Sequence, residues 1–200
     1  MGSSMPNDLY ARTSPALLAV HACERAASEY EAAISGDTAR WFFAITDMHQ
    51  ALTAALVETL SGTAGIGALS KKLQQQWLNY YDNRGADVQP PADDRVITFG
   101  ELLERACDTA NCHDMQGTLM LTDGEKKDLL RLNDFRNDLA HVKPRGWSLE
   151  IAGLPRIFGA AAKAMRQLFE MAPLRLHLEE DEIERAVRSI DAVAVRPAEQ

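Results

Sequence analysis

The sequence predicts an all-α fold, a helical bundle with additional helices. Apolar residues recur at spacings of three and four along most of the 200 residues, as they do on the buried face of a helix. Thr98 and Thr122 each open the Thr-x-x-Glu pattern of a helix N-terminus. The only fragments with strand character are 95–97 and 147–151, which would form at most one two-stranded ribbon.

Three helices are predicted in the first half of the chain, over 14–36, 37–60 and 69–81. Ser14 and Pro15 supply a capping side chain and a proline at the first helical position, and Gly36 stops the first helix. The second helix carries a broad apolar stripe that should face the core. His49 lies on this amphipathic helix, and we assign it no special role.

The loop 61–67, between the second and third predicted helices, contains three glycines. A glycine-rich loop in front of a helix can cradle a phosphate. Here no predicted strand precedes the loop, and the Gly-Lys-Ser/Thr ending of a P-loop is missing. We therefore interpret it as a flexible connection, with phosphate binding as the alternative.

Four helices are predicted in the second half, over 98–109, 122–142, 156–171 and 178–192. Pro144 ends the second of these, because proline lacks a backbone N–H and restricts the residue before it. We expect one helical domain over 14–193. A disordered or tag-derived N-terminus at 1–13 would precede it, and a frayed C-terminus at 194–200 would follow.

Composition indicates a cytoplasmic globular protein without a membrane anchor. The sequence has no apolar run long enough to span a bilayer and no signal-peptide pattern, and its three cysteines are irregularly spaced. A net charge of −8 is unlike that of proteins that wrap nucleic acid without sequence preference. Residues 131–166 nevertheless carry a net charge of +4, and residues 178–200 one of −4. This local basic region suits a small anion or a short RNA segment, or is an ordinary charged surface.

The best functional candidates lie in the last turns of the predicted helix 122–142. Leu132, Phe135 and Leu139 form its apolar face. Polar side chains beside an apolar face cost stability unless they are paired or used. The seam beside this face contains Asn133, Arg136, Asn137 and His141.

Arg136, Asn137 and His141 combine three chemical abilities. Arginine offers a planar fork of donors to phosphate oxygens, asparagine orients a hydroxyl or an imidazole, and histidine exchanges protons near neutral pH. Together they could stabilise charge on a phosphoryl group and move a proton without a metal. The structural alternative is that Arg136 pairs with an acid on a neighbouring helix and His141 acts as a cation at the helix C-terminus.

The run 132–142, which contains Arg136, Asn137 and His141, resembles the Arg-x4–6-His motif of the HEPN superfamily of small all-helical domains. This resemblance implies a HEPN-like bundle. It also implies a metal-independent endoribonuclease with a toxin or defence role, whose homodimer brings two copies of the motif to one cleft. Other members of the superfamily imply the alternative, a non-catalytic module that binds a nucleotide, RNA or a partner such as a separate antitoxin.

The same resemblance implies the role of each residue. His141 would be the acid or base at the ribose 2′-hydroxyl or the leaving oxygen, Arg136 would stabilise the transition state, and Asn137 would position the histidine or the phosphate. Cleavage would leave a 2′,3′-cyclic phosphate. Asn133 in the seam is an expected substrate-binding residue. Two cations of the following loop, which are solvated in the alternative interpretation, complete the expected set: Lys143 and Arg145.

No metal or other cofactor is expected. Cys107, Cys112 and His113 are residue types that ligate metals, but the spacing C-x4-C-H is not a zinc pattern and no fourth ligand is evident.

Overall fold

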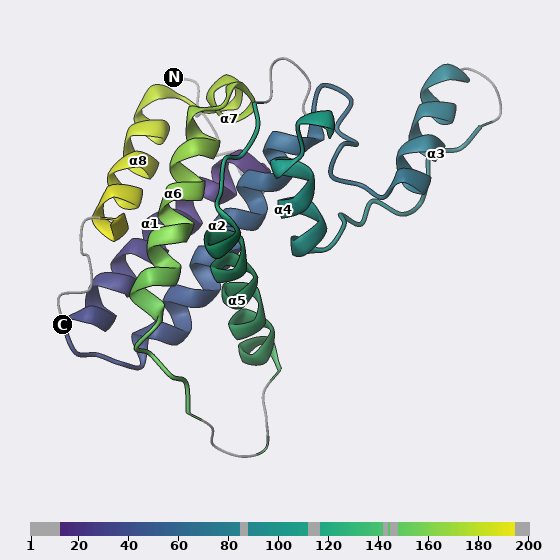
Figure 1. The fold of residues 1–200 in the computed structure, drawn as a ribbon. Helices are drawn as coiled ribbons and strands as arrows, with labels where there is room; N and C mark the ends of the chain where they lie inside the picture. Colours follow the sequence, from purple (N-terminus) through teal and green to yellow (C-terminus); the bar gives the residue numbers. More distant parts are fainter. Residues whose placement is uncertain (1–12, 85–87, 112–116, 142–143, 145–147, 195–200) are drawn as a thin grey trace, which may run out of the picture.

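The fold is built on two long helices that lie along each other, α1 (Pro15–Ile34) and α2 (Arg40–Ser61) (Figure 1). The computed structural model describes residues 13–84, 88–111, 117–141, 144 and 148–194. The helix α1 begins as its sequence predicts, since the Ser14 side chain accepts a hydrogen bond from the backbone N–H of Leu17.

Two further helices cover α2, and a third covers α1. The helices α5 (Asp123–Ala140) and α6 (Leu154–Glu170) both pack against α2, while α8 (Glu180–Ala194) packs against α1 and α6. The all-α prediction is confirmed. One short helix, α7 (Ala172–His177), was not predicted, because six residues are too few to display a helical period.

An aromatic cluster in the main core joins α1, α2 and α6. The rings of Tyr30 and Phe158 stack with centroids 5.0 Å apart, and Trp41 meets both rings edge-on at 5.5 and 5.6 Å. All three side chains are buried. Aromatic rings bury more apolar area than most side chains do, so this cluster anchors α6 across the α1–α2 pair.

The helix α4 (Phe99–Cys107) contacts α2 and α5 and is followed by a 3₁₀ turn, η1 (Thr109–Asn111). Both α4 and α5 open with complete capping boxes, built on Thr98 and Thr122, so this prediction is confirmed. The helix α3 (Lys71–Asp82) projects from the bundle and packs on its own small apolar cluster, which includes Leu73 (Figure 1).

The loop 61–67 has a defined, hydrogen-bonded shape. The backbone N–H groups of Ile66 and Gly67 both donate to the carbonyl of Ser61. The guanidinium of Arg105, on α4, donates to the carbonyls of Gly67 and Leu69. The loop is thus tied to the bundle by an arginine that lies 38 residues further along the chain.

The predicted two-stranded ribbon is not formed by the parts of 95–97 and 147–151 that the structure describes. Val96 instead forms a single antiparallel bridge with Leu69. Next to this bridge, the backbone N–H of Ile97 donates to the carbonyl of Ala68 at 3.0 Å. A strand fragment pairs with the backbone that the fold brings next to it. Here that backbone is the segment just before α3, at Ala68 and Leu69.

Candidate functional site

The helix α5 presents the sequence motif at its exposed C-terminal end. Leu129, Leu132 and Phe135 on its buried face hold it against the bundle. Arg136 and Asn137 lie in the last helical turn and are exposed. Burial of one face therefore leaves the motif accessible to a ligand or to a second protein.

His141 lies just beyond the last helical residue. The helix ends at Ala140, and His141 is the capping residue, with φ −106° and ψ 100°. The extended backbone of His141 turns the chain away from the helix axis at this residue. Asn137 Oδ1 accepts a hydrogen bond from Arg136 Nη1 at 3.1 Å. Within the described residues, His141 is exposed and makes no hydrogen bond.

Asn133 is partly buried and joins α5 to α2. Its Oδ1 lies 3.0 Å from Nε2 of His49, which is 6% exposed. On the other side of the imidazole, Nδ1 lies 3.5 Å from the hydroxyl of Thr53, and the ring packs 4.7 Å from that of Phe99. The structure therefore gives Asn133, which was predicted to bind substrate, an internal partner.

His49 is the site residue that the sequence interpretation missed. Burial and the positive charge of Arg136 lower the pKa of His49 to about 4, against the opposing effect of the Asn133 hydrogen bond. The imidazole is therefore neutral at pH 7. A signal was present in the sequence, because position 49 falls on the apolar stripe formed by Ile45, Met48 and Leu52.

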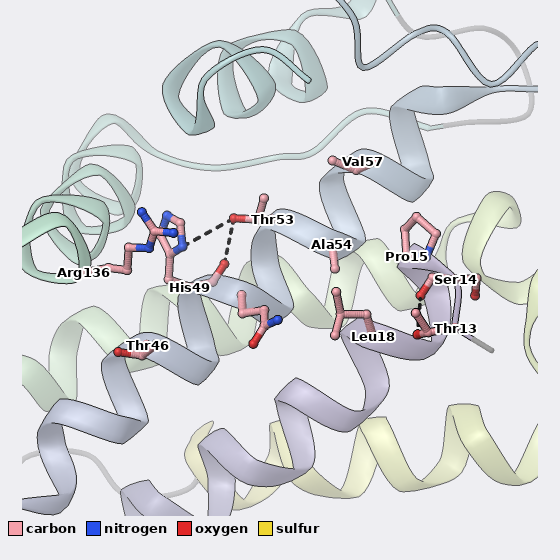
Figure 2. Close-up of a pocket in the computed structure, with 11 residues that line it drawn as sticks. Thr13, Ser14, Pro15, Leu18, Thr46, His49, Thr53, Ala54, Val57 and Arg136 are labelled. Atoms are coloured by element: carbon pink, nitrogen blue, oxygen red, sulfur yellow. Dashed lines mark hydrogen bonds between the residues drawn. The ribbon is translucent and has the colours of Figure 1, made fainter. Parts of the chain in front are cut away.

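A cavity of about 620 Å³ opens beside His49 and Arg136. It runs along α2 between Thr46 and Val57 and reaches the beginning of α1 at 13–18. Figure 2 shows Arg136 next to His49 toward one end of the cavity, with Pro15 and its neighbours toward the other. The predicted site arginine thus lines a cavity whose walls are contributed chiefly by α1 and α2.

In the predicted basic region, three of the five cations that the structure describes are paired with carboxylates. Arg156 donates to both carboxylate oxygens of the buried Asp128. Two further ion pairs join α6 to α5 and to α8 through partly exposed side chains: Lys163–Glu125 and Arg166–Asp191. Outside the basic region, Arg185 on α8 pairs with Glu24 on α1. The acidic helix α8 accordingly packs along α1 and α6 rather than along α5.

Several predicted residues lie outside the part of the chain that the structure describes. These are the two loop cations and two of the three residues considered as metal ligands: Lys143, Arg145, Cys112 and His113. Among the described residues, no group of three or more His, Cys, Asp or Glu side chains is arranged to hold a metal ion.

No helix within the described ranges is both long and apolar enough to cross a membrane.

In comparisons with protein-family models, curated proteins and solved structures, nothing matched this chain.

Proposed function

We propose that this protein is a metal-independent endoribonuclease of the HEPN type, acting as a homodimer in which two copies of Arg136 and His141 face one cleft. The observation that carries the proposal is the state of Arg136. It is exposed, it lines the cavity, and its single hydrogen bond within the described residues is to the neutral Asn137. A guanidinium without a carboxylate partner is suited to bind a phosphate.

The reaction needs no group beyond the RNA and the protein. His141 of one copy takes the proton from a ribose 2′-hydroxyl, and the 2′-oxygen attacks the adjacent phosphorus. Arg136 stabilises the additional negative charge on the phosphoryl oxygens. The bond from phosphorus to the 5′-oxygen breaks, and that oxygen receives a proton from His141 of the second copy. The products carry a 2′,3′-cyclic phosphate and a 5′-hydroxyl.

A second candidate function is a non-catalytic module that binds a nucleotide or RNA, or that contacts a partner such as an antitoxin. The position of His141 favours this candidate. Within the described part of a single chain it has no hydrogen-bonding partner that would orient its imidazole. A catalytic histidine is usually oriented by a neighbour. In the nuclease proposal, that partner must come from the second copy or from the substrate.

The two candidates are separated by RNA cleavage in EDTA. Wild type, His141→Ala and Arg136→Lys are compared with His21→Ala, which removes an exposed histidine on α1. Light scattering and circular dichroism establish equal oligomeric state and fold. We expect His141→Ala to abolish cleavage, Arg136→Lys to weaken it because lysine lacks the planar fork, and His21→Ala to leave it unchanged.

Cyclic-phosphate ends on the wild-type products would support the assigned mechanism. Cleavage that is equal in wild type and His141→Ala would overturn it. A folded wild-type dimer that cuts no RNA but binds it would favour the non-catalytic module instead.

A further inference from the structure

The helix α3 projects from the bundle and leaves much of its surface exposed (Figure 1). Its inner face consists of Leu73, Trp77 and Tyr81, which pack with two apolar residues of the segment before the helix. These three positions recur every four residues, so the positions just before them form a second stripe beside the inner face. The second stripe contains Lys72, Gln76 and Tyr80. The small apolar cluster therefore accounts for one face of α3 and leaves the neighbouring stripe open to a partner.

The C-terminal end of α3 brings three aromatic rings and a guanidinium into contact. The ring of Tyr80 lies 5.8 Å from those of both Trp77 and Tyr81. Just beyond the helix, the guanidinium of Arg84 lies over the Tyr81 ring, 4.7 Å from its centroid, and 5.9 Å from that of Tyr80. Arg84 is exposed, so the other face of its planar guanidinium is available. Nucleobases stack on such guanidinium planes as they do on aromatic rings.

The charge of this projecting helix differs from that of the whole protein. Residues 70–84 carry a net charge of +2, whereas the chain carries −8. Three exposed cations account for the excess, and none of them forms an ion pair with a described residue: Lys71, Lys72 and Arg84. Unpaired cations next to aromatic rings are the combination that binds the phosphates and bases of a single nucleic acid strand.

The cations are distributed along α3. From Lys72, near the start of the helix, to Arg84 beyond its end the distance is roughly 18 Å, at about 1.5 Å per residue. A stacked strand advances about 3.4 Å per nucleotide, so this length matches roughly five nucleotides. A paired strand keeps its bases stacked inside the duplex, where Arg84 and Tyr80 cannot reach them. The surface therefore suits an unpaired strand.

We propose that α3 binds an unpaired RNA strand, with phosphates on Lys71 and Lys72 and a base stacked on the guanidinium of Arg84 beside Tyr80. The inference rests on the proposed function for its ligand, RNA. It adds a binding surface on a different part of the molecule from the motif at the end of α5 (Figure 1). Its consequence is a preference for single-stranded over paired RNA, which the motif by itself does not specify.

Fluorescence anisotropy with a labelled single-stranded DNA of about twelve nucleotides tests the proposal. A strand without 2′-hydroxyls offers the same phosphates and base faces but cannot be cleaved by the proposed reaction. We expect it to bind about tenfold more tightly than a duplex of the same length. The double variant Lys71→Gln, Lys72→Gln should lower the slope of log affinity against log salt by about 1.4, which is about 0.7 for each lost phosphate contact.

A matched control for this variant is Lys126→Gln, Lys127→Gln, which removes two adjacent lysines from the start of α5 and changes the net charge equally. It should leave the salt slope at the wild-type value. A second test separates stacking from charge. Arg84→Lys keeps the positive charge but removes the planar face, so it should weaken binding about tenfold without changing the salt slope. Circular dichroism establishes that each variant keeps its fold.

Three results would overturn the proposal. The first is a duplex that binds as tightly as the single strand. The second is an equal salt slope in the α3 and α5 double-lysine variants. The third is wild-type affinity in Arg84→Lys, which would exclude stacking on the guanidinium.

The failure of this inference is distinguishable from failure of the nuclease proposal, because binding is measured without turnover. If RNA is cut but the α3 variants bind the single strand as wild type does, the nuclease stands and the α3 surface falls. If the single strand binds with the expected slope and no RNA is cut, the α3 surface stands and catalysis falls.

Discussion

His49 on α2 and Asn133 on α5 are hydrogen-bonded through Nε2 and Oδ1 at 3.0 Å, although 84 residues separate them in the chain. This contact lies directly beneath the exposed motif, one helical turn before Arg136. Through this contact, Asn133 of the polar seam on α5 takes part in the packing of α5 against α2.

The stability of the protein should fall as the pH is lowered from about 6.5 to 4. The pKa of His49 is about 4 in the folded protein and has its ordinary value of 6.5 in the unfolded chain. Between these values the unfolded chain binds a proton that the folded protein does not, so acid favours unfolding, by up to about 3 kcal/mol. Urea unfolding at pH 7, 5.5 and 4.5 should show a smaller decline in His49→Gln than in wild type.

The exposed His21, which pairs with Glu24 on α1, provides the control for this measurement. The His21→Gln variant should keep the wild-type decline in the free energy of unfolding. A His49→Gln protein that loses stability with acid as steeply as wild type does would show that His49 is not the group responsible.

Removing either partner of the His49–Asn133 hydrogen bond should destabilise the fold. Asn133→Ala leaves the buried imidazole without its acceptor, which costs about 1–3 kcal/mol. His49→Phe removes the donor and places an apolar ring beside Phe99. A double-mutant cycle on the free energy of unfolding at pH 7 should give a coupling of about 1 kcal/mol between the two positions. Strictly additive effects would rule out a stabilising contact.

Arg156→Met should destabilise the protein because Asp128, which is 7% exposed, would lose the guanidinium that binds both of its oxygens. A buried carboxylate left without this partner costs about 2 kcal/mol. In the Asp128→Asn, Arg156→Met double variant, part of that loss should be recovered. Chemical denaturation measures each value. The surface pair Arg95–Asp93 supplies the control, since Arg95→Met should have little effect.

Two glycines should respond to alanine in opposite ways. A Cβ atom on Gly67 would lie 1.7 Å from the carbonyl oxygen of Leu60, so Gly67→Ala must shift the backbone after α2. We expect a loss of about 3 kcal/mol. A Cβ on Gly159, within α6, meets no atom within 4 Å, so Gly159→Ala should stabilise the helix by about 1 kcal/mol. Thermal unfolding of both variants checks the signs, and a shift of the same sign in both would refute the prediction.

The sequence alone was sufficient to predict every described α-helix except α7, and most of their starting points. Ser14 caps α1, and the capping boxes at Thr98 and Thr122 form as expected, because each involves residues three positions apart. Apolar spacing likewise placed the buried faces of α2 and α5. The ends were harder to predict, since the motif helix stops at Ala140 and leaves His141 in extended backbone.

The surroundings of the candidate residues were decided only by tertiary structure. The sequence identifies Arg136 and Asn133 as polar residues on one helix, but it cannot specify which helix packs against them. Packing α5 on α2 brings His49 to Asn133 and places Arg136 at the cavity. The physical reason is the range of the interactions. Caps and periodicity depend on neighbours within one or two turns, whereas burial, hydrogen bonds between helices and cavity shape depend on residues that the whole core brings together.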